Sequence, residues 1–354
     1  MIIDEKYMYR CLQLAQNGRG YTAPNPMVGA VIVHNGKVIG EGYHRRCGES
    51  HAEVNAVNNV KDPALLKEST IYVSLEPCSH YGKTPPCSQL IIDKGIPRVI
   101  VACLDPYPAV SGRGVKMLCD AGIDVKIGVL EKEAWELNKE FFTAQTKKRP
   151  YIYLKWAQTK DGYIDKERNE GEEPHSTPIS NDFCRMLVHK RRAEVSAIMI
   201  GTNTAIKDNP TLTTRFWHGK NPIRIVLDRR GRIPLGYNIF DGKVETIIFT
   251  EKEIYENVNN GVKYIRTAFD RDFIRHIFEE LKWLKINSVL VEGGRELLQS
   301  LIDAGFWDEA TIETSNVCFN KGVKAPVISG NIVAEYNWGT SKQVHLSALD
   351  NYKI

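Results

Sequence analysis

The chain has 354 residues, of which 42% are hydrophobic and 25% charged. This is a globular composition, and the length suits two domains with separate cores. The net charge of +4 argues against nucleic acid as a partner but allows local basic pockets for phosphorylated small molecules. No apolar run approaches the roughly 18 residues of a membrane span, and the charged N-terminus lacks the apolar core of a signal peptide, so we expect a cytoplasmic protein without membrane contact.

The first half of the chain alternates between helix and strand patterns. Apolar residues at helical spacing predict a helix over 4–17, and VGAVIVHNGKVIGEGYH predicts a hairpin that turns at Asn35–Gly36. The following segments are expected to be a helix over 52–60, a strand in STIYVSLEP, a helix in SQLIIDKGI, a strand in PRVIVACLD, a helix in VKMLCDAGI, a strand in DVKIGV and a helix over 131–142. This alternation is typical of an α/β sandwich with parallel strand pairs.

A polar, basic run that ends at Pro150 predicts a domain boundary, with one domain over 1–146 and a second over 150–354. The second half alternates again. We expect strands in YIYLKWAQ, SAIMIGTNT, IRIVLD, TIIFT and INSVLVEGG, and helices near 181–191, 270–284 and 294–304. The last fifty residues carry no motif that indicates a function.

Eight cysteines occur in a chain without signs of export, a setting in which buried thiols or metal ligands are commoner than disulfides. Five of them lie in apolar or helical contexts and are expected to be buried thiols: Cys11, Cys103, Cys119, Cys184 and Cys318. Cys78 and Cys87 differ, because they belong with His51 and Glu53 to a metal-ligand pattern.

In that pattern, Ser-His-Ala-Glu at 50–53 is followed by Glu-Pro-Cys at 76–78 and then by Cys87. One imidazole and two thiolates leave a fourth tetrahedral position on zinc for water, whose pKa the metal lowers. Glu53, expected at a helix start, is placed to move protons. We expect Cys78 to begin a helix whose dipole favours the thiolate. The alternatives are a closed structural zinc site, which usually has four protein ligands, and a coincidental arrangement of Cys and His.

The H-x-E…P-C signature is associated with nucleobase deaminases. Eight residues separate the cysteines here, instead of the usual two, and they place His80 and Lys83 on a loop beside the metal. Several segments resemble the deaminase domain of the bifunctional riboflavin-biosynthesis deaminase–reductases, namely TAPNPMVGAVIV, HAEVNA, YVSLEPCSHYGKTPPC and the DP of CLDPYP. This resemblance covers residues 1–145. It implies a cytidine-deaminase-like α/β/α sandwich, with Asn25 lining the base pocket and with ribose phosphate contacts from His44, His80, Lys83 and Asp105.

The second half lacks a GxGxxG fingerprint, but three segments suggest ligand binding. In LVEGGRELLQSLIDAG a glycine pair joins a strand to a helix, which lets backbone amides approach a pyrophosphate, although such a pair is more often only a turn. GTNTAIKDNPTLTTR is a polar loop of the kind that carries function. Arg229 and Arg230 end a strand, where guanidinium groups suit the 2′-phosphate of NADP; the alternative is a solvated turn.

Taken in order, KWAQTKDG, RMLVHKRRAEVSAIMIGTNTAIKDNPTLTTR, PIRIVLD and VEGG resemble the reductase domain of the same family, which has a dihydrofolate-reductase-like α/β fold. The resemblance implies NADPH contacts from Ala157, Thr204, Asp208, Arg229, Gly293 and Gly294. It also implies substrate contacts from Ser176, Arg192, Leu212, Arg215 and Glu292. The chain departs from the family at Pro178, where members commonly have Trp, and in the long acidic stretch DKERNEGEEPHS.

The resemblance implies two activities and two cofactors, one Zn²⁺ per chain and NADPH. The first activity is hydrolytic deamination of 2,5-diamino-6-ribosylamino-4(3H)-pyrimidinone 5′-phosphate. The second is NADPH-dependent reduction of the ribosyl side chain to give 5-amino-6-ribitylamino-uracil 5′-phosphate. One alternative is a different zinc nucleoside or nucleobase deaminase with an unrelated nucleotide-binding domain, and another is a zinc-stabilised binding protein without catalysis. We also expect a homo-oligomer.

Overall fold

A computed structural model describes residues 3–81, 85–107, 111–168, 172–253 and 261–349. The chain divides into two compact units, Met1–Lys148 (unit 1) and Arg149–Ile354 (unit 2). In this described part of the chain, no helix combines the length and the apolar character that crossing a membrane requires.

Unit 1 is built on one five-stranded sheet with the order β2-β1-β3-β4-β5. The strands are β1 (Gly29–His34), β2 (Lys37–Tyr43), β3 (Thr70–Val73), β4 (Arg98–Val101) and β5 (Asp124–Ile127). β1 runs antiparallel to β2 and β3, whereas β3, β4 and β5 are parallel. The functional loops of an α/β sheet gather at the carboxyl ends of its parallel strands, and β3 leads directly to Cys78.

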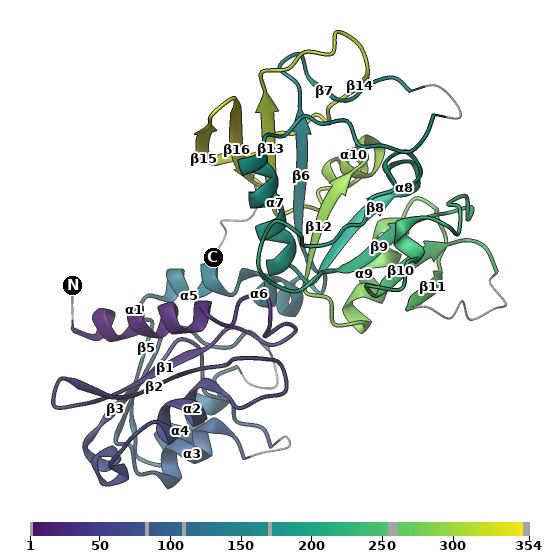
Figure 1. Cartoon of the computed structure of the whole chain (residues 1–354). Coiled ribbons are helices and arrows are strands. Elements are labelled where there is room, and N and C mark those ends of the chain that lie inside the picture. Colours follow the sequence, from purple (N-terminus) through teal and green to yellow (C-terminus); the bar gives the residue numbers. More distant parts are fainter. Residues whose placement is uncertain (1–2, 82–84, 108–110, 169–171, 254–260, 350–354) are drawn as a thin grey trace. The chain divides into compact units, whose positions relative to one another are not determined.

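Helices cover both faces of this sheet (Figure 1). They are α1 (Ile3–Gln16), α2 (Ala52–Asn58), η1 (Pro63–Glu68), α3 (Cys87–Asp93), α4 (Arg113–Asp120), α5 (Glu131–Leu137) and α6 (Lys139–Thr146). α1, α5 and α6 share one apolar core with the sheet, and α2, α3 and α4 share the core on the opposite face. The strands alternate between these two cores, as period-two side-chain geometry requires. Unit 1 is therefore an α/β/α sandwich.

The hairpin turn of unit 1 is confirmed, because Asn35 and Gly36 both have positive φ, 47° and 74°. The single helix expected over 131–142 is wrong. The chain breaks at Asn138, whose Oδ1 accepts the N–H of Met27 and whose Nδ2 donates to the Met27 carbonyl, each at 2.8 Å. The Asn138 side chain thus holds another segment of backbone at the point where α5 ends.

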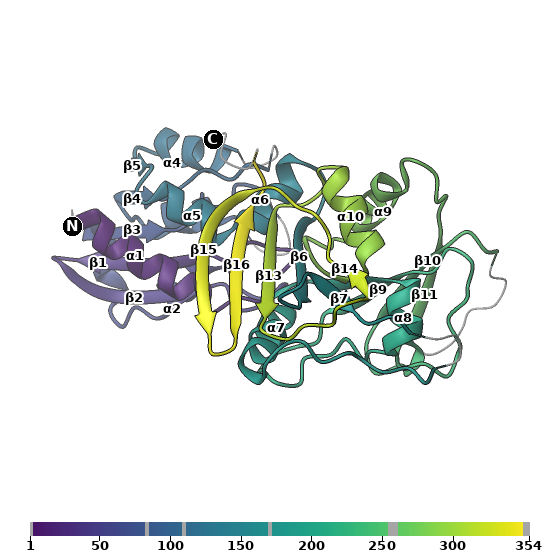
Figure 2. The ribbon, with the colours of Figure 1, turned by 90° about the horizontal axis from the view of Figure 1, so that it is seen from above.

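Unit 2 contains a nine-stranded sheet with the order β11-β10-β9-β8-β12-β6-β13-β16-β15, and a small second sheet pairs β14 with β7. The strands are β6 (Tyr151–Gln158), β7 (Tyr163–Asp165), β8 (Ala197–Gly201), β9 (Ile223–Leu227), β10 (Thr246–Thr250), β11 (Val262–Arg266), β12 (Ser288–Gly293), β13 (Glu309–Ser315), β14 (Val323–Lys324), β15 (Asn331–Trp338) and β16 (Ser341–Ser347). The strands from β11 to β13 are parallel, β16 runs antiparallel to β13, and the edge strand β15 runs antiparallel to β16 (Figure 2).

The helices of unit 2 are α7 (Asp182–Glu194), α8 (Thr202–Asp208), η2 (Asn238–Phe240), α9 (Phe273–Trp283) and α10 (Arg295–Asp303). α9 and α10 pack on one face of the large sheet, where Ile152 and Leu154 of β6 point. Tyr153 points to the opposite face, where Arg191 of α7 lies over its ring. By the same alternation Lys155 and Ala157 face the α7 side.

The extent of one expected strand of unit 2 and the burial of two cysteines need correction. The strand expected in SAIMIGTNT ends at Gly201, and Thr202 begins α8, so Thr204 lies in the first turn of a helix. The C-terminal region without a motif supplies three strands of the large sheet, of which β15 is mostly exposed and so lacks an alternating apolar pattern. Cys119 of unit 1 and Cys318 are exposed, not buried as expected.

Candidate functional site

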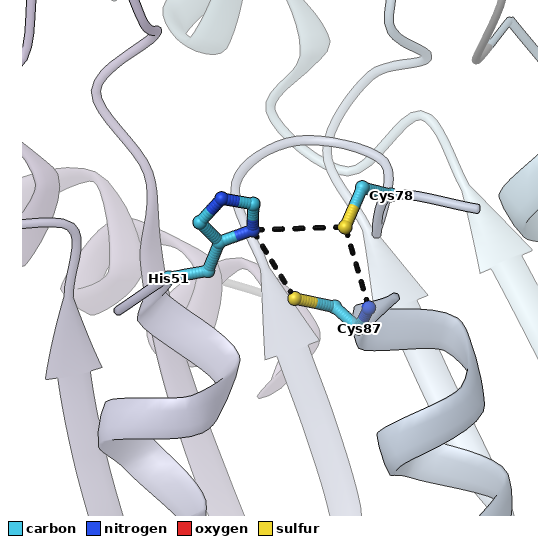
Figure 3. Close-up of side chains that lie close together, drawn as sticks. All are labelled: His51, Cys78 and Cys87. Atoms are coloured by element: carbon cyan, nitrogen blue, oxygen red, sulfur yellow. Dashed lines mark hydrogen bonds between the residues drawn. The ribbon is translucent and has the colours of Figure 1, made fainter. Parts of the chain in front are cut away.

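Three expected zinc ligands meet in unit 1. The imidazole of His51 and the thiols of Cys78 and Cys87 point toward one another (Figure 3). His51 Nδ1 lies 3.6 Å from Cys78 Sγ and 3.3 Å from Cys87 Sγ, and all three donor atoms lie within 4.8 Å of one another. An imidazole and two thiols at this separation are a donor set that suits zinc. Among the described residues, no other cluster of His, Cys, Asp and Glu has this geometry.

The expectation that Cys78 begins a helix is wrong. Cys78 lies in irregular chain after β3, and Cys87 begins α3 after two prolines. The backbone N–H at this helix start donates to Cys78 Sγ at 3.3 Å. Hydrogen bonds from Cys87, and then from His51, hold the pKa of the Cys78 thiol well below its ordinary value. The helix dipole that favours the Cys78 thiolate therefore comes from α3 and not from a helix of its own.

Glu53 lies in the first turn of α2, two residues after His51, and is 3% exposed. Burial, together with the charge of Cys78, raises the pKa of Glu53 to about 7, although a hydrogen bond with Cys87 acts in the opposite direction. A carboxyl group in this environment can both accept and release a proton near neutral pH. It sits beside two of the metal ligands, where a general acid–base group is needed.

Two of the expected substrate contacts lie together beside His51. The Asn25 side-chain nitrogen is 3.3 Å from His44 Nε2, and His44 Nδ1 is 3.2 Å from the Ser50 carbonyl. The His44 ring meets the His51 ring edge-on, with 5.6 Å between centroids. Burial lowers the pKa of His44. Both ring nitrogens of His44 thus have partners within unit 1, and these contacts fix the ring beside His51.

Asp105 is another expected substrate contact of unit 1. Its carboxyl group is buried, and burial together with the charge of Glu76 raises its pKa to about 6, while His80 acts to lower it. His80 is exposed, and Lys83 lies outside the described residues. Tyr107, which stands where the family often has Asn, donates its backbone N–H to Asp105 Oδ1 at 2.8 Å.

In unit 2 the structure pairs two residues that were expected to contact substrate. Arg192 of α7 donates to both oxygens of Glu292 on β12, at 2.8 and 2.6 Å, and its Nη1 donates to the Thr213 carbonyl at 3.0 Å. Burial acts to raise the pKa of Glu292, but the charge and hydrogen bonds of Arg192 hold it below its ordinary value. Lys155 of β6, which sequence reasoning missed, adds to this effect.

Arg215 lies close to this pair. Its backbone N–H donates to His189 Nδ1 at 2.9 Å, and its guanidinium donates to the hydroxyls of Thr213 and Thr211. Burial lowers the pKa of Arg215, as does the charge of Arg192. Leu212 is 2% exposed and packs in the core of unit 2, so its side chain is not available to a ligand.

Three expected cofactor residues meet where β12 gives way to α10. A Cβ atom on Gly294 would lie 2.9 Å from Thr204 Oγ1, and one on Gly293 would lie 3.8 Å from it. Beside them Arg295 begins α10, and its Nε is buried without a hydrogen-bond partner in the part of the chain that is described. A narrow glycine cradle, a helix start and an unsatisfied guanidinium nitrogen fit the pyrophosphate of a dinucleotide.

The remaining expected residues of unit 2 lie in different settings. Ala157 lies near the end of β6. Asp208 ends α8 and pairs with Arg168, with 2.9 Å between Oδ1 and Nη2, and Ser176 is exposed on the segment whose His175 carbonyl accepts from Arg168. Arg229 follows β9, is half exposed, and pairs with Glu251 at 2.7 Å.

Sequence reasoning also missed Glu76 and Arg168. Glu76 was read only as part of the Glu-Pro-Cys motif, yet it is 4% exposed and accepts hydrogen bonds from four backbone N–H groups. Arg168 lies in the long acidic stretch and also pairs with Asp165. Each occurs next to a recognisable motif, but nothing in the sequence indicates the partners that they find.

Comparison with known proteins finds matches over both units. Residues 1–103 match the family model described as the cytidine and deoxycytidylate deaminase zinc-binding region, and residues 150–315 match the RibD C-terminal domain. The riboflavin biosynthesis protein RibD of Aquifex aeolicus is 44% identical over 88% of this chain and 86% of its own length. That of Bacillus amyloliquefaciens is 38% identical over 93% and 88%.

Solved structures show the same likeness. A diaminohydroxyphosphoribosylaminopyrimidine deaminase/5-amino-6-(5-phosphoribosylamino)uracil reductase from Thermotoga maritima is 36% identical. It superimposes with a TM-score of 0.87 over 98% of this chain and 99% of that one. RibD of Acinetobacter baumannii is 30% identical, with the same score over 98% of each chain. The expected fold is thereby confirmed, with a cytidine-deaminase domain followed by a dihydrofolate-reductase-like RibD domain.

Proposed function

This chain belongs to the RibD family of bifunctional riboflavin-biosynthesis enzymes, which join a zinc-dependent deaminase to an NADPH-dependent reductase, and we propose its substrate and the roles of its residues. Unit 1 hydrolytically deaminates 2,5-diamino-6-ribosylamino-4(3H)-pyrimidinone 5′-phosphate. Unit 2 then reduces the ribosyl side chain of the product to ribityl. The observation that carries this proposal is the three-residue metal cluster with the buried Glu53 beside it.

In the deaminase, His51, Cys78 and Cys87 would hold the zinc. When bound with a free coordination position, zinc makes a coordinated water acidic enough to act as nucleophile at neutral pH. Glu53 takes a proton from the attacking water and delivers protons to the ring nitrogen and to the departing amine, so that water is consumed and ammonia leaves. Its buried carboxyl group, with a pKa near 7, suits both transfers.

The rest of the deaminase pocket binds and orients the substrate. Asn25, whose side chain meets His44 beside His51, would hydrogen-bond the pyrimidinone. The ribose phosphate would be contacted by His44, His80, Lys83 and Asp105. Asp105 suits a sugar hydroxyl, because its carboxyl group can accept or donate a hydrogen bond near its pKa of about 6.

In the reductase, NADPH supplies the hydride when bound. Six residues would hold the cofactor: Ala157, Thr204, Asp208, Arg229, Gly293 and Gly294. Gly293 and Gly294, which lie close to Thr204, would bind the pyrophosphate of NADPH. Arg229 would bind its 2′-phosphate. Arg215 would pair with the substrate phosphate, because Glu292 already balances the charge of Arg192. The substrate would also contact Ser176, the backbone at Leu212, and the Arg192–Glu292 pair.

One experiment tests the whole proposal. The purified full chain is incubated with the diaminopyrimidine ribosyl phosphate, with and without NADPH, and both ammonia and NADPH oxidation are followed. We expect ammonia in both samples and NADPH oxidation only after deamination. Ammonia release from cytidine or guanine instead would contradict the proposed substrate, and ammonia without any NADPH oxidation would contradict the proposed role of unit 2.

We also propose that the chain forms a homo-oligomer. β15 lies at the edge of the large sheet and exposes Ile332, Val333 and Tyr336, and an apolar edge strand is suited to pairing with a second copy. Light scattering on the purified chain, compared with an Ile332→Lys variant, tests this directly. A cytoplasmic location stays a prediction, as do the domain limits 1–146 and 150–354.

A further inference from the structure

Acidic side chains usually lie on the surface, but the carboxylate of Glu76 is buried and accepts hydrogen bonds from backbone N–H groups. It follows β3 directly before Pro77 and Cys78 and is 4% exposed. Its Oε2 accepts the backbone N–H groups of Asp105 (3.2 Å) and Gly112 (2.9 Å). Its Oε1 accepts those of Gly114 (2.8 Å) and Val115 (3.2 Å). Both oxygens are therefore fully used inside the protein, and Glu76 is not available to contact substrate.

The four donors belong to the two ends of one segment. Gly112 is the N-cap of α4, with φ of 72°, and Gly114 and Val115 are in its first turn. These N–H groups have no partner within their own helix, and a negative charge at this end is favourable. Asp105 lies at the other end of the segment. One carboxylate thus fixes the start of α4 and the backbone of Asp105 to the same point, through four charge-assisted hydrogen bonds.

The start of α4 also packs closely against the two segments that carry the thiol ligands. A Cβ atom on Gly114 would lie 2.0 Å from the Pro77 carbonyl oxygen, so only glycine permits the contact. The Ser88 hydroxyl donates to that same carbonyl at 3.1 Å and to the Gly114 carbonyl at 3.4 Å. Pro77 precedes Cys78 and Ser88 follows Cys87. The backbone that carries both thiol ligands therefore packs against the start of α4.

We propose that Glu76 is a positioning residue for deamination, which fixes Asp105 relative to Cys78 and Cys87 so that the substrate sugar and the metal are held at one spacing. This inference rests on the proposed contact between Asp105 and the substrate. A purely structural role would affect the stability of unit 1 alone. A positioning role acts through Asp105 and must change substrate binding.

The test is a double-mutant cycle in the zinc-loaded full chain, with Glu76→Gln, Asp105→Ala and the double variant. Gln keeps the size of Glu but turns an NH₂ group toward two of the N–H donors. For Glu76→Gln we expect KM for the diaminopyrimidine ribosyl phosphate to rise about tenfold, kcat to change less than threefold, and zinc content to stay at one per chain. In the Asp105→Ala background the same substitution should change KM less than twofold, because coupled residues are not additive.

Tyr72→Phe is the matched control, because it removes another buried side-chain hydrogen bond of unit 1, from Tyr72 to Asp4 Oδ1 at 3.0 Å. It should leave KM unchanged. Circular dichroism and thermal unfolding of each variant report whether unit 1 is folded, because reduction of deaminated substrate reports on unit 2 alone. Should Glu76→Gln fail to fold, the cycle is run with Glu76→Asp, which keeps the charge on a shorter stem and should raise KM less than tenfold.

The outcomes separate the two proposals. If Asp105→Ala leaves KM unchanged, the substrate contact assigned to Asp105 is wrong. If Asp105→Ala raises KM but Glu76→Gln does not, or raises it equally in both backgrounds, the positioning role of Glu76 is overturned. Loss of zinc from Glu76→Gln would also overturn it, because it would place the effect on the ligands themselves.

Discussion

Arg192 and Glu292 form a two-point ion pair in unit 2, with Nε–Oε1 and Nη2–Oε2 distances of 2.8 and 2.6 Å. Only 11% and 14% of the two side chains is exposed. From the sequence, Arg192 and Glu292 were each expected to contact the substrate, and no pairing between them was predicted. The structure makes them partners of each other first, so any substrate contact is made by an oriented, nearly neutral pair.

Breaking this pair should cost unit 2 much of its stability. Arg192→Met keeps the length of the side chain but leaves the buried Glu292 charge unpaired, which typically costs about 3–5 kcal/mol. We expect a loss of this size in the free energy of unfolding, measured by urea titration of tryptophan fluorescence. Of the six tryptophans, only Trp135 lies in unit 1, so the signal reports mainly unit 2.

Deamination serves as the control for Arg192→Met and should be unchanged. Adding Glu292→Gln to the variant should recover part of the lost stability, because the unpaired charge is then removed, but should not recover reduction. An unchanged unfolding free energy in the single variant would mean that the pair is not a stabilising contact.

Glu53→Gln should separate metal binding from catalysis. The amide cannot carry protons, so kcat for deamination should fall by about 10²–10⁴, while zinc content stays at one per chain and reduction of deaminated substrate is unchanged. Ammonia release and metal analysis check this. Activity within tenfold of the parent chain would rule out Glu53 as the proton carrier.

Metal removal should affect the two activities differently. The three expected ligands all lie in unit 1, and the described part of unit 2 holds no comparable cluster. Dialysis against a chelator should abolish deamination, and added Zn²⁺ should restore it. Reduction of deaminated substrate should continue throughout. Parallel loss of both activities would show that zinc supports the whole chain.

Arg229 should determine the choice between NADPH and NADH. Its pairing with Glu251 is solvent-exposed, and such pairs contribute little stability, so the guanidinium can turn to a 2′-phosphate. Arg229→Ala should raise KM for NADPH about tenfold and leave KM for NADH unchanged. Glu251→Gln removes the charge that competes for Arg229, so it should not raise KM for NADPH. If Arg229→Ala raised KM for NADPH and for NADH equally, Arg229 would not be the residue that distinguishes the two cofactors.

His189 should make unit 2 sensitive to acid. Burial, together with the charges of Arg192 and Arg215, lowers its pKa to about 4 from 6.5. Between these values the unfolded chain binds a proton that the folded chain does not, so stability falls as pH falls, by up to about 1.4 kcal/mol per pH unit. Urea titrations at pH 7.5 and 5 measure the difference.

His189→Gln is the matched comparison, because its side-chain oxygen can still accept the Arg215 N–H that His189 Nδ1 accepts at 2.9 Å but does not titrate. The loss of stability between pH 7.5 and 5 should be smaller in this variant. The remaining acidic and basic groups contribute to both proteins, so an identical pH dependence would assign the effect to other residues.

Residue types and their order were enough to identify the zinc ligands. Ligand type and order are chemical properties of the chain, so the zinc ligands His51, Cys78 and Cys87 could be recognised without coordinates, and the role of Glu53 stays a prediction. Periodic apolar patterns located most helices and strands for the same reason, since a buried face repeats at the period of its element. The exposed β15 gave no such pattern and was missed.

Which polar groups meet could not be predicted from the sequence and follows from the folded structure. The donors to Glu76 lie up to 39 residues away along the chain, and Arg192 and Glu292 are separated by 100. The helix that supports the Cys78 thiolate begins at Cys87, and Asn138 ends a helix by binding Met27. A hydrogen bond depends on approach to within about 3 Å in space, and sequence spacing does not encode that approach until the sheet has brought the loops together.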